Sequence, residues 1–119
     1  MSDQPLHPVG SQLLYEDDKV RVWALEVAPG ETFPRHLHDH DYVTISLAEG
    51  ETEAHEADGS IRRNRRVPGD IQLTRVGSGQ THELKNVGTT VYRNRIIEFK
   101  ERISASDVPP VNVNILEAR

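Results

Sequence analysis

The sequence of 119 residues contains no cysteine. This absence excludes disulfide bonds, thiolate metal ligands and cysteine nucleophiles together. No apolar run is long enough to cross a bilayer, and no apolar segment follows a basic one near the N-terminus. We therefore expect no membrane association and no secretory signal, and we predict a cytoplasmic location.

The chain also has fewer positively charged residues than negatively charged ones. The chain has 14 Lys and Arg against 19 Asp and Glu, and its formal net charge is −5 at pH 7. Nucleic-acid binding needs a basic surface that neutralises phosphates, so we expect no nucleic-acid partner.

The sequence does contain a series of short apolar segments separated by turn residues. Gly, Pro and Asp interrupt the chain at intervals of about eight to twelve residues, and no amphipathic-helix pattern is present. This pattern is typical of an all-β sandwich or barrel. Besides a histidine-rich strand, we expect strands at residues 12–15, 20–27, 43–48, 51–56, 61–66, 71–76 and 91–101.

The length predicts a single domain over residues 1–119. An N-terminal arm covers about residues 1–10, and the barrel covers about residues 12–101. A C-terminal tail of about residues 102–119 offers a further edge strand or a contact with a neighbouring subunit. His7, in the proline-containing arm, is interpreted as an exposed residue without a role.

A hairpin is expected around Asp58-Gly59, because this dipeptide favours a two-residue turn between strands. The arginines on one strand would then lie beside the glutamates on the other, as cross-strand charge pairs. His55 is interpreted as a solvated hairpin residue. The two-residue loop predicts the pairs Glu51–Arg66, Ala54–Arg63 and His55–Arg62.

Three of the six histidines lie within five positions, at His36, His38 and His40. On an extended strand, alternate side chains share a face, so His36 and His38 point the same way, with Cα atoms about 6.6 Å apart. Two imidazoles at this spacing can bind one metal ion. His40 continues the alternation, but the polar run Asp39–Asp41 is typical of a bend, which favours a place outside the metal site.

Two segments of the chain contain motifs that belong together. The first reads Gly30, His36-Leu37-His38, Tyr42 or Val43, and Gly50. The second reads Gly77-Ser78-Gly79-Gln80-Thr81-His82-Glu83-Leu84-Lys85-Asn86. Together they resemble the paired motifs of the cupin superfamily, with Gly77 where proline is usual. The resemblance covers about residues 20–100 and implies a double-stranded β-helix, a jelly-roll cupin barrel.

The resemblance also implies a metal site held by His36, His38 and His82. The family has a glutamate in the first motif, and this chain has none there. Tyr42 keeps the strand parity of the two histidines, whereas Val43 keeps the spacing to Gly50. We favour Tyr42 as the residue that faces the metal, and we predict that it takes part in catalysis as a phenolate ligand, a general base or a hydrogen-bond donor.

The resemblance and the residues together predict a metal-dependent enzyme for a small, anionic molecule. Three neutral imidazoles leave the charge of the ion uncompensated, which attracts an anion. The metal is expected to be a divalent transition metal (iron, zinc, nickel or manganese). Oxygenase, isomerase and lyase chemistry all remain open, as does a non-catalytic protein that binds or senses a small ligand. Small cupins commonly pair, so we expect a homodimer.

Overall fold

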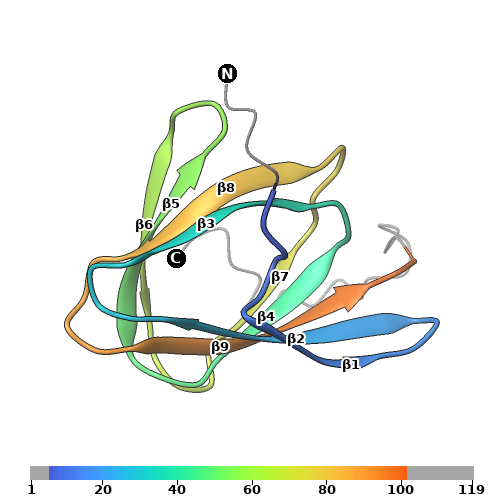
Figure 1. Ribbon diagram of the computed structural model, residues 1–119, viewed down its shortest axis with the longest axis horizontal. Coiled ribbons are helices and arrows are strands. Elements are labelled where there is room, and N and C mark those ends of the chain that lie inside the picture. The colour runs from blue at the N-terminus through green and yellow to red at the C-terminus, as the bar shows by residue number, and fades with distance from the viewer. Residues whose placement is uncertain (1–5, 102–119) are drawn as a thin grey trace, which may run out of the picture.

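The computed structural model describes residues 6–101, and these residues form nine strands and no helix (Figure 1). The all-β class is therefore confirmed. No described segment is a helix of the length and apolarity that would cross a membrane. Residues 1–5 and the predicted tail at 102–119 lie outside the described part of the chain. The strands are β1 (Gln12–Glu16), β2 (Val20–Val27), β3 (Thr32–His38), β4 (Tyr42–Ser46), β5 (Gly50–Glu56), β6 (Ile61–Arg66), β7 (Ile71–Thr74), β8 (Gln80–Asn86) and β9 (Tyr92–Phe99).

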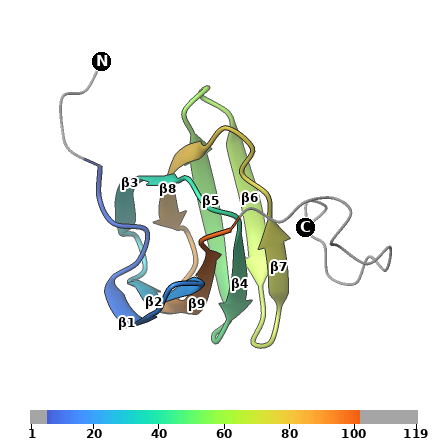
Figure 2. The same ribbon diagram turned by 90° about the vertical axis from the view of Figure 1, so that its right-hand side faces the viewer.

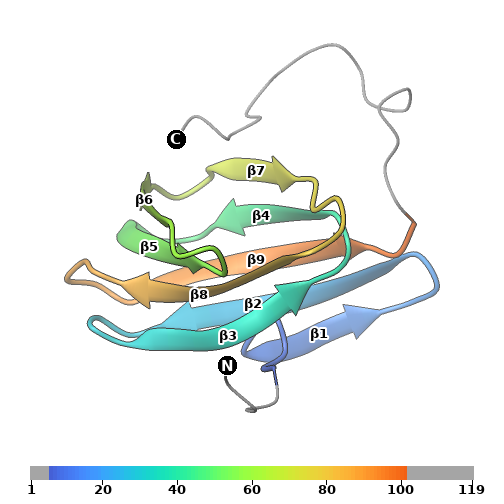
Figure 3. The same ribbon diagram turned by 90° about the horizontal axis from the view of Figure 1, so that it is seen from above.

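The strands form two antiparallel sheets that face each other (Figure 2). One sheet has the order β1-β2-β9-β4-β7, which can be followed from above in Figure 3, and the other has the order β3-β8-β5-β6. Sequence neighbours such as β8 and β9 lie in different sheets, as the predicted jelly roll requires. The core between the sheets is made by Leu25, Val27, Phe33, Tyr42, Val76, Tyr92 and Ile96.

Strand β3 departs from simple alternation in a way that matters for the site. Its register against β8 shifts between Phe33 and His36, which is the mark of a β-bulge. Because of this extra residue, Phe33, His36 and His38 are all buried on the interior side. Pro34 lies within the bulge, where the backbone N–H that proline lacks is not needed for the ladder.

The predicted hairpin between β5 and β6 is present, but its predicted register is wrong by one residue. The observed pairs are Glu51↔Arg65, Ala54↔Arg62 and His55↔Ile61. The amide of Glu56 donates to the carbonyl oxygen of Ser60 at 2.9 Å, so the loop has three residues rather than two. Gly59 adopts a φ of 91°, the left-handed conformation that a three-residue loop places at its last position.

The predicted arm is tied to both sheets over its described residues. The amide of His7 donates to the carbonyl of Arg35 on β3 at 2.9 Å, and the amide of Ser11 donates to Ala24 on β2 at 2.7 Å. Val9 is buried between these two attachments. His7, predicted to be exposed, is half-buried, with its ring against Phe33 at a centroid distance of 4.8 Å.

Candidate metal centre

The structure brings His36, His38 and His82 together between the two sheets. His36 and His38 lie on β3, and His82 is paired with His36 on the neighbouring strand β8. Their ring centroids are 4.7 to 5.0 Å apart, and one nitrogen of each lies within 4.8 Å of those of the other two. The three residues are 3%, 2% and 7% exposed. Three imidazoles at this separation converge on a space that one ion can fill.

Hydrogen bonds orient two of these rings. Nδ1 of His36 lies 2.7 Å from the carbonyl oxygen of Pro34, which can only accept, so this nitrogen carries the proton. Nδ1 of His82 makes a longer contact of 3.5 Å with the Glu56 carboxylate, which again accepts. In both rings Nε2 is left with its lone pair. Such outer hydrogen bonds are the usual way in which proteins orient histidine ligands of metals.

Burial keeps the three imidazoles uncharged. Desolvation is the main cause that lowers the pKa of His36 to about 4 and that of His38 to about 2, and the neighbouring histidines contribute in the same direction. Desolvation also lowers the pKa of His82, although the Glu56 carboxylate opposes the shift. Within residues 6–101, Nδ1 of His38 is a buried nitrogen without a hydrogen-bond partner. Neutral, buried and incompletely satisfied imidazoles fit a transition-metal ion.

Tyr42 lies directly beside this cluster. Its ring stacks on His38 with a centroid distance of 4.1 Å and an interplanar angle of 19°. Its hydroxyl donates to Oε1 of Gln80 at 3.1 Å, and burial raises the pKa of the phenol to about 12. Tyr42 lines the cavity in front of the histidines, while Val43 is half-buried and is not part of its lining. Tyr42, which strand parity favoured over Val43, is thus the residue that lies against the histidines in the structure.

Glu56 is a site residue that the sequence reasoning missed. Its Oε2 accepts from Nη2 of Arg62 at 3.1 Å and faces His82, and its Oε1 accepts from Nε2 of Gln80 at 3.4 Å. The carboxylate therefore connects the ring of His82 with the amide that holds Tyr42. No local sequence pattern indicates this role. Glu56 reaches His82 only because β5 pairs with β8, and these strands are not consecutive in the sequence.

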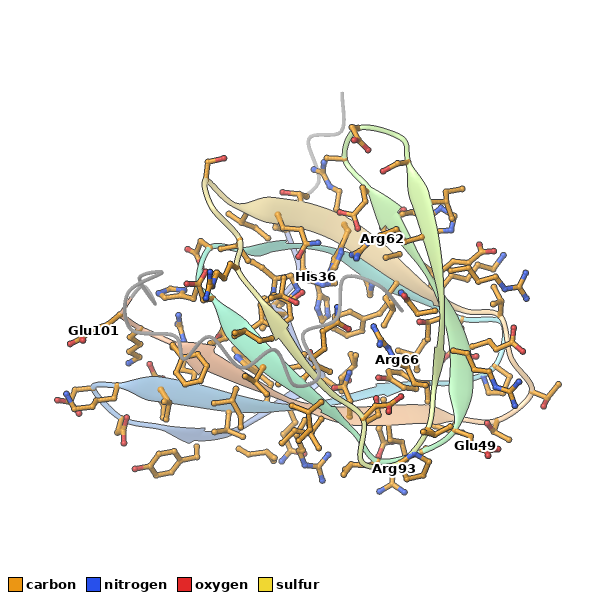
Figure 4. The ribbon with its side chains drawn as sticks, turned by 180° about the vertical axis from the view of Figure 1, so that it is seen from behind. His36, Glu49, Arg62, Arg66, Arg93 and Glu101 are labelled. Carbon is orange, nitrogen blue, oxygen red and sulfur yellow. The ribbon has the colours of Figure 1, made fainter. Side chains whose placement is uncertain are left out.

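The histidines open on a cavity of about 70 Å³ between the sheets. Its lining includes two arginines, Arg62 and Arg66, and no carboxylate; Val9 of the arm contributes one wall. Both arginines extend from β6 toward the interior, where His36 also lies (Figure 4). The predicted cross-strand pairing of the arginines therefore describes them only in part. Arg63 pairs with Glu51 and Arg62 pairs with Glu56, each at 3.1 Å, but Arg62 and Arg66 also line the cavity.

The other histidines lie outside the cluster. Nδ1 of His40 is 2.7 Å from Asp39 and 3.4 Å from the guanidinium of Arg21. Glu98 lies close to both Asp39 and His40, but its carboxylate accepts from Trp23 at 2.7 Å and pairs with Arg21 at 3.3 Å. The guanidinium of Arg21 is thus the positive charge that lies against these acidic side chains. His55 is half-buried and contacts Glu53 at 3.1 Å.

Comparison with known proteins supports the fold. No protein-family model and no curated protein sequence matches the chain. Among solved structures, it is similar to a cupin domain from Bordetella pertussis, with 21% identity and a TM-score of 0.68 over 76% of this chain and 91% of that one. A protein with a double-stranded β-helix domain from Klebsiella pneumoniae has 23% identity and a TM-score of 0.56, over 77% and 75% of the two chains.

A DMSP lyase from Ruegeria pomeroyi is also similar, with 21% identity and a TM-score of 0.53. The match covers 75% of this chain and 42% of the lyase. The chain therefore has the double-stranded β-helix fold of the cupin superfamily, as the two motifs predicted.

Proposed function

We propose that this chain is a metal-dependent cupin enzyme that acts on a small anionic molecule, a carboxylate or an enolisable metabolite. One observation carries the proposal: three buried, neutral imidazoles open on a cavity that arginines line and carboxylates do not. His36, His38 and His82 would hold a divalent transition metal, with iron, zinc, nickel and manganese as the candidates. A bound ion would supply Lewis-acid chemistry or an activated water or dioxygen.

The side chains around the cluster favour an anionic ligand. Three neutral imidazoles do not offset the charge of a divalent ion, and Arg62 adds a further positive charge at the cavity wall. The Glu56 carboxylate pairs with Arg62 but lies outside the cavity lining. Because Glu56 offsets much of the charge of Arg62, the positive charge that favours a carboxylate over a neutral molecule of the same size would come mainly from the bound ion.

Tyr42 is the residue to which we assign a direct catalytic role. Its hydroxyl is oriented by Gln80, and burial keeps the proton on the phenol oxygen. With its one proton turned from Gln80 toward the bound molecule, it would act as a hydrogen-bond donor to that molecule, at the position where the family has a glutamate. This choice leaves the phenolate and general-base roles as the less favoured alternatives.

The class of reaction stays a prediction. Oxygenase, isomerase and lyase chemistry are each compatible with a metal, a proton donor and an anion-binding wall, and the lyase from Ruegeria pomeroyi has a similar fold. A ligand-binding or sensing protein without catalysis is the alternative. A homodimer and a cytoplasmic location also remain predictions from the sequence.

Metal analysis tests the proposal directly. Protein prepared without a histidine tag should contain close to one divalent transition metal per chain, either as purified or after reconstitution and desalting. Elemental analysis by mass spectrometry gives the ratio, and a sample treated with a chelator before desalting serves as the blank. Protein that takes up no transition metal after reconstitution would remove both the enzyme and the metal-centred binding function.

The variant Tyr42→Phe tests the assignment of the hydroxyl. We expect affinity of the metal-loaded protein for acetate to fall about tenfold, because a hydrogen bond to a charged group is lost. The free energy of unfolding should fall by only about 1 kcal/mol, since the ring and its stacking remain. Calorimetric titration and urea unfolding measure the two quantities.

Tyr15→Phe is the matched control, because its hydroxyl donates to Asp17 at an exposed position. This control should bind acetate as the parent does. Equal acetate affinity in Tyr42→Phe and in the parent would show that Tyr42 has a packing role alone.

A further inference from the structure

An apolar row crosses the outer face of the five-stranded sheet. The two sheets face each other, so each has an outer face that no strand of residues 6–101 covers (Figure 2). Core residues such as Leu25 and Tyr42 point inward, and the residues between them along each strand point outward. Because paired residues share a face, the strand registers place one apolar side chain from each strand in a continuous row. The row consists of Tyr15, Val22, Ile97, Val43 and Leu73.

Neighbouring residues widen the row into an apolar patch. The pair Val20–Phe99 lies beside the row on one side, and the pair Ile45–Ile71 lies beside it on the other. Arg95, which is paired with Ile45, is the charged side chain among them. Ile71 at the margin is 41% exposed, and the other members of these pairs are half-buried. A contiguous apolar patch on a soluble protein usually marks a contact surface.

The described chain ends at the margin of this patch. Strand β9 is the central strand of the sheet, and Phe99 is its last residue (Figure 3). The amide of Lys100 then donates to the carbonyl of Lys19 at 2.9 Å, and its ammonium pairs with Glu16 at 2.7 Å. Residues 102–119 therefore continue from the turn between β1 and β2, next to the row.

The sequence beyond Glu101 contains an apolar segment of matching length. In residues 111–116, Val111, Val113 and Ile115 alternate with asparagines at 112 and 114. This alternation predicts an extended segment with one apolar side and one polar side. Six extended residues span about 20 Å, and a row across five strands spans about 19 Å. The nine residues from 102 to 110 reach up to about 30 Å, which is enough to bring the segment over any part of the row.

We propose that residues 111–116 of the same chain cover the apolar row. Val111, Val113 and Ile115 would lie against the sheet, with the two asparagines toward water, so that both apolar surfaces leave the solvent. A segment joined to the sheet by a short linker has an effective concentration of about millimolar, which favours it over a second copy of the chain in dilute solution. The proposal does not depend on the metal centre.

Thiol reactivity tests whether the segment is covered on one side. The chain has no cysteine, so Val113→Cys and Asn114→Cys each place a single thiol in the full-length protein. Both variants are treated with a disulfide reagent that releases a coloured thiolate, first in buffer and then in urea. We expect Val113→Cys to react about tenfold more slowly than Asn114→Cys in buffer, because a covered thiol reacts only when the segment opens. The rates should be equal in urea, and equal rates in buffer would overturn the inference.

A change in the row tests whether this sheet provides the cover. In the Val113→Cys protein, Ile97→Thr should make the thiol react about threefold faster, because apolar contact surface is lost. The control is Ile61→Thr, since Ile61 is 57% exposed on β6 of the facing sheet, and it should leave the rate unchanged. If Ile97→Thr does not fold, Ile71→Thr at the margin of the patch replaces it. An unchanged rate in the row variant, or an equal increase in the control, contradicts the proposal.

Cross-linking distinguishes the chain's own segment from that of a second copy. Val113→Cys is combined with Val43→Cys in the row, or with Ile61→Cys as the control, and each protein is treated with a short bis-maleimide. We expect denaturing electrophoresis to show linked single chains for the row pair and about tenfold less of this product for the control pair. Linked pairs of chains in place of linked single chains would assign the cover to a second copy and overturn the proposal.

Discussion

Changing His82 to alanine is expected to lower the affinity for a divalent transition metal by more than about a hundredfold. Loss of a residue that only orients a ligand typically costs 10- to 100-fold in metal affinity, and loss of a ligand itself costs more. His82 is the one member of the cluster that β8 supplies, and it is paired with His36 across the sheet. Without it, the two imidazoles of β3 alone would face the ion.

Spectroscopic titration with cobalt or competition with a zinc dye measures this effect. The control is His55→Ala, because His55 is a half-buried histidine of the neighbouring strand β5 and contacts Glu53 rather than the cluster. The control should bind metal as the parent does. If both variants lose the same affinity, or if neither loses any, the metal centre does not lie where we have assigned it.

The second large effect concerns stability. Changing Asn86 to alanine is expected to lower the free energy of unfolding by about 3 kcal/mol, because three hydrogen bonds of about 1 kcal/mol each are lost. The side chain of Asn86 is fully buried. It donates to the carbonyls of Val27 and Thr90, each at 2.8 Å, and accepts from the amide of Gly88 at 2.9 Å. It thereby joins the end of β8 to β2 in the facing sheet and to the turn before β9.

Urea unfolding of the metal-free protein measures this loss. Lys85→Ala is the control, since Lys85 is exposed on the same strand and its removal should change the free energy by less than about 0.5 kcal/mol. Folded Asn86→Ala should bind metal as the parent does, because Asn86 is not part of the cavity lining. A loss below about 1 kcal/mol would show that Asn86 is not the structural clamp described here. The last residue of the second motif would then need another explanation.

Local patterns in the sequence predicted much of the fold. The strand β2 was predicted with its observed bounds, and the all-β class followed from short strands between turns. The jelly roll was predicted from the resemblance of the two motifs to the cupin superfamily. The expected strand at 71–76 ends at Thr74 in the structure, and that at 91–101 is β9, Tyr92–Phe99. Ends of strands depend on where the partner strand stops, which the segment itself does not encode.

The hairpin register is the clearest failure of sequence reasoning. Asp58-Gly59 does form a turn, but Gly59 serves as the left-handed residue of a three-residue loop. A shift of one residue changes every cross-strand partner, because pairing proceeds in step from the turn. Both loop lengths suit the same dipeptide, so the choice between them depends on how β5 and β6 pack against the rest of the sheet.

The sequence by itself determined what depends on neighbouring residues. Alternation along β3 places His36 and His38 on one face, because successive side chains point to opposite sides. Tyr42 begins β4 in the other sheet, so the parity that favoured it over Val43 did not by itself place it beside the histidines. The absence of cysteine left histidine as the main candidate ligand, and the two motifs indicated His82 as the third. The structure brings these residues together, although binding of a metal remains to be measured.

Only the tertiary structure decided which distant side chains share the site. Glu56 meets His82 across 26 positions of sequence, and Arg66 reaches Gln72 from a different sheet. The arm closes one wall of the cavity through Val9, which no local pattern predicts. Such contacts follow from the order of strands in the two sheets, and that order is set by packing of the whole core rather than by any single segment.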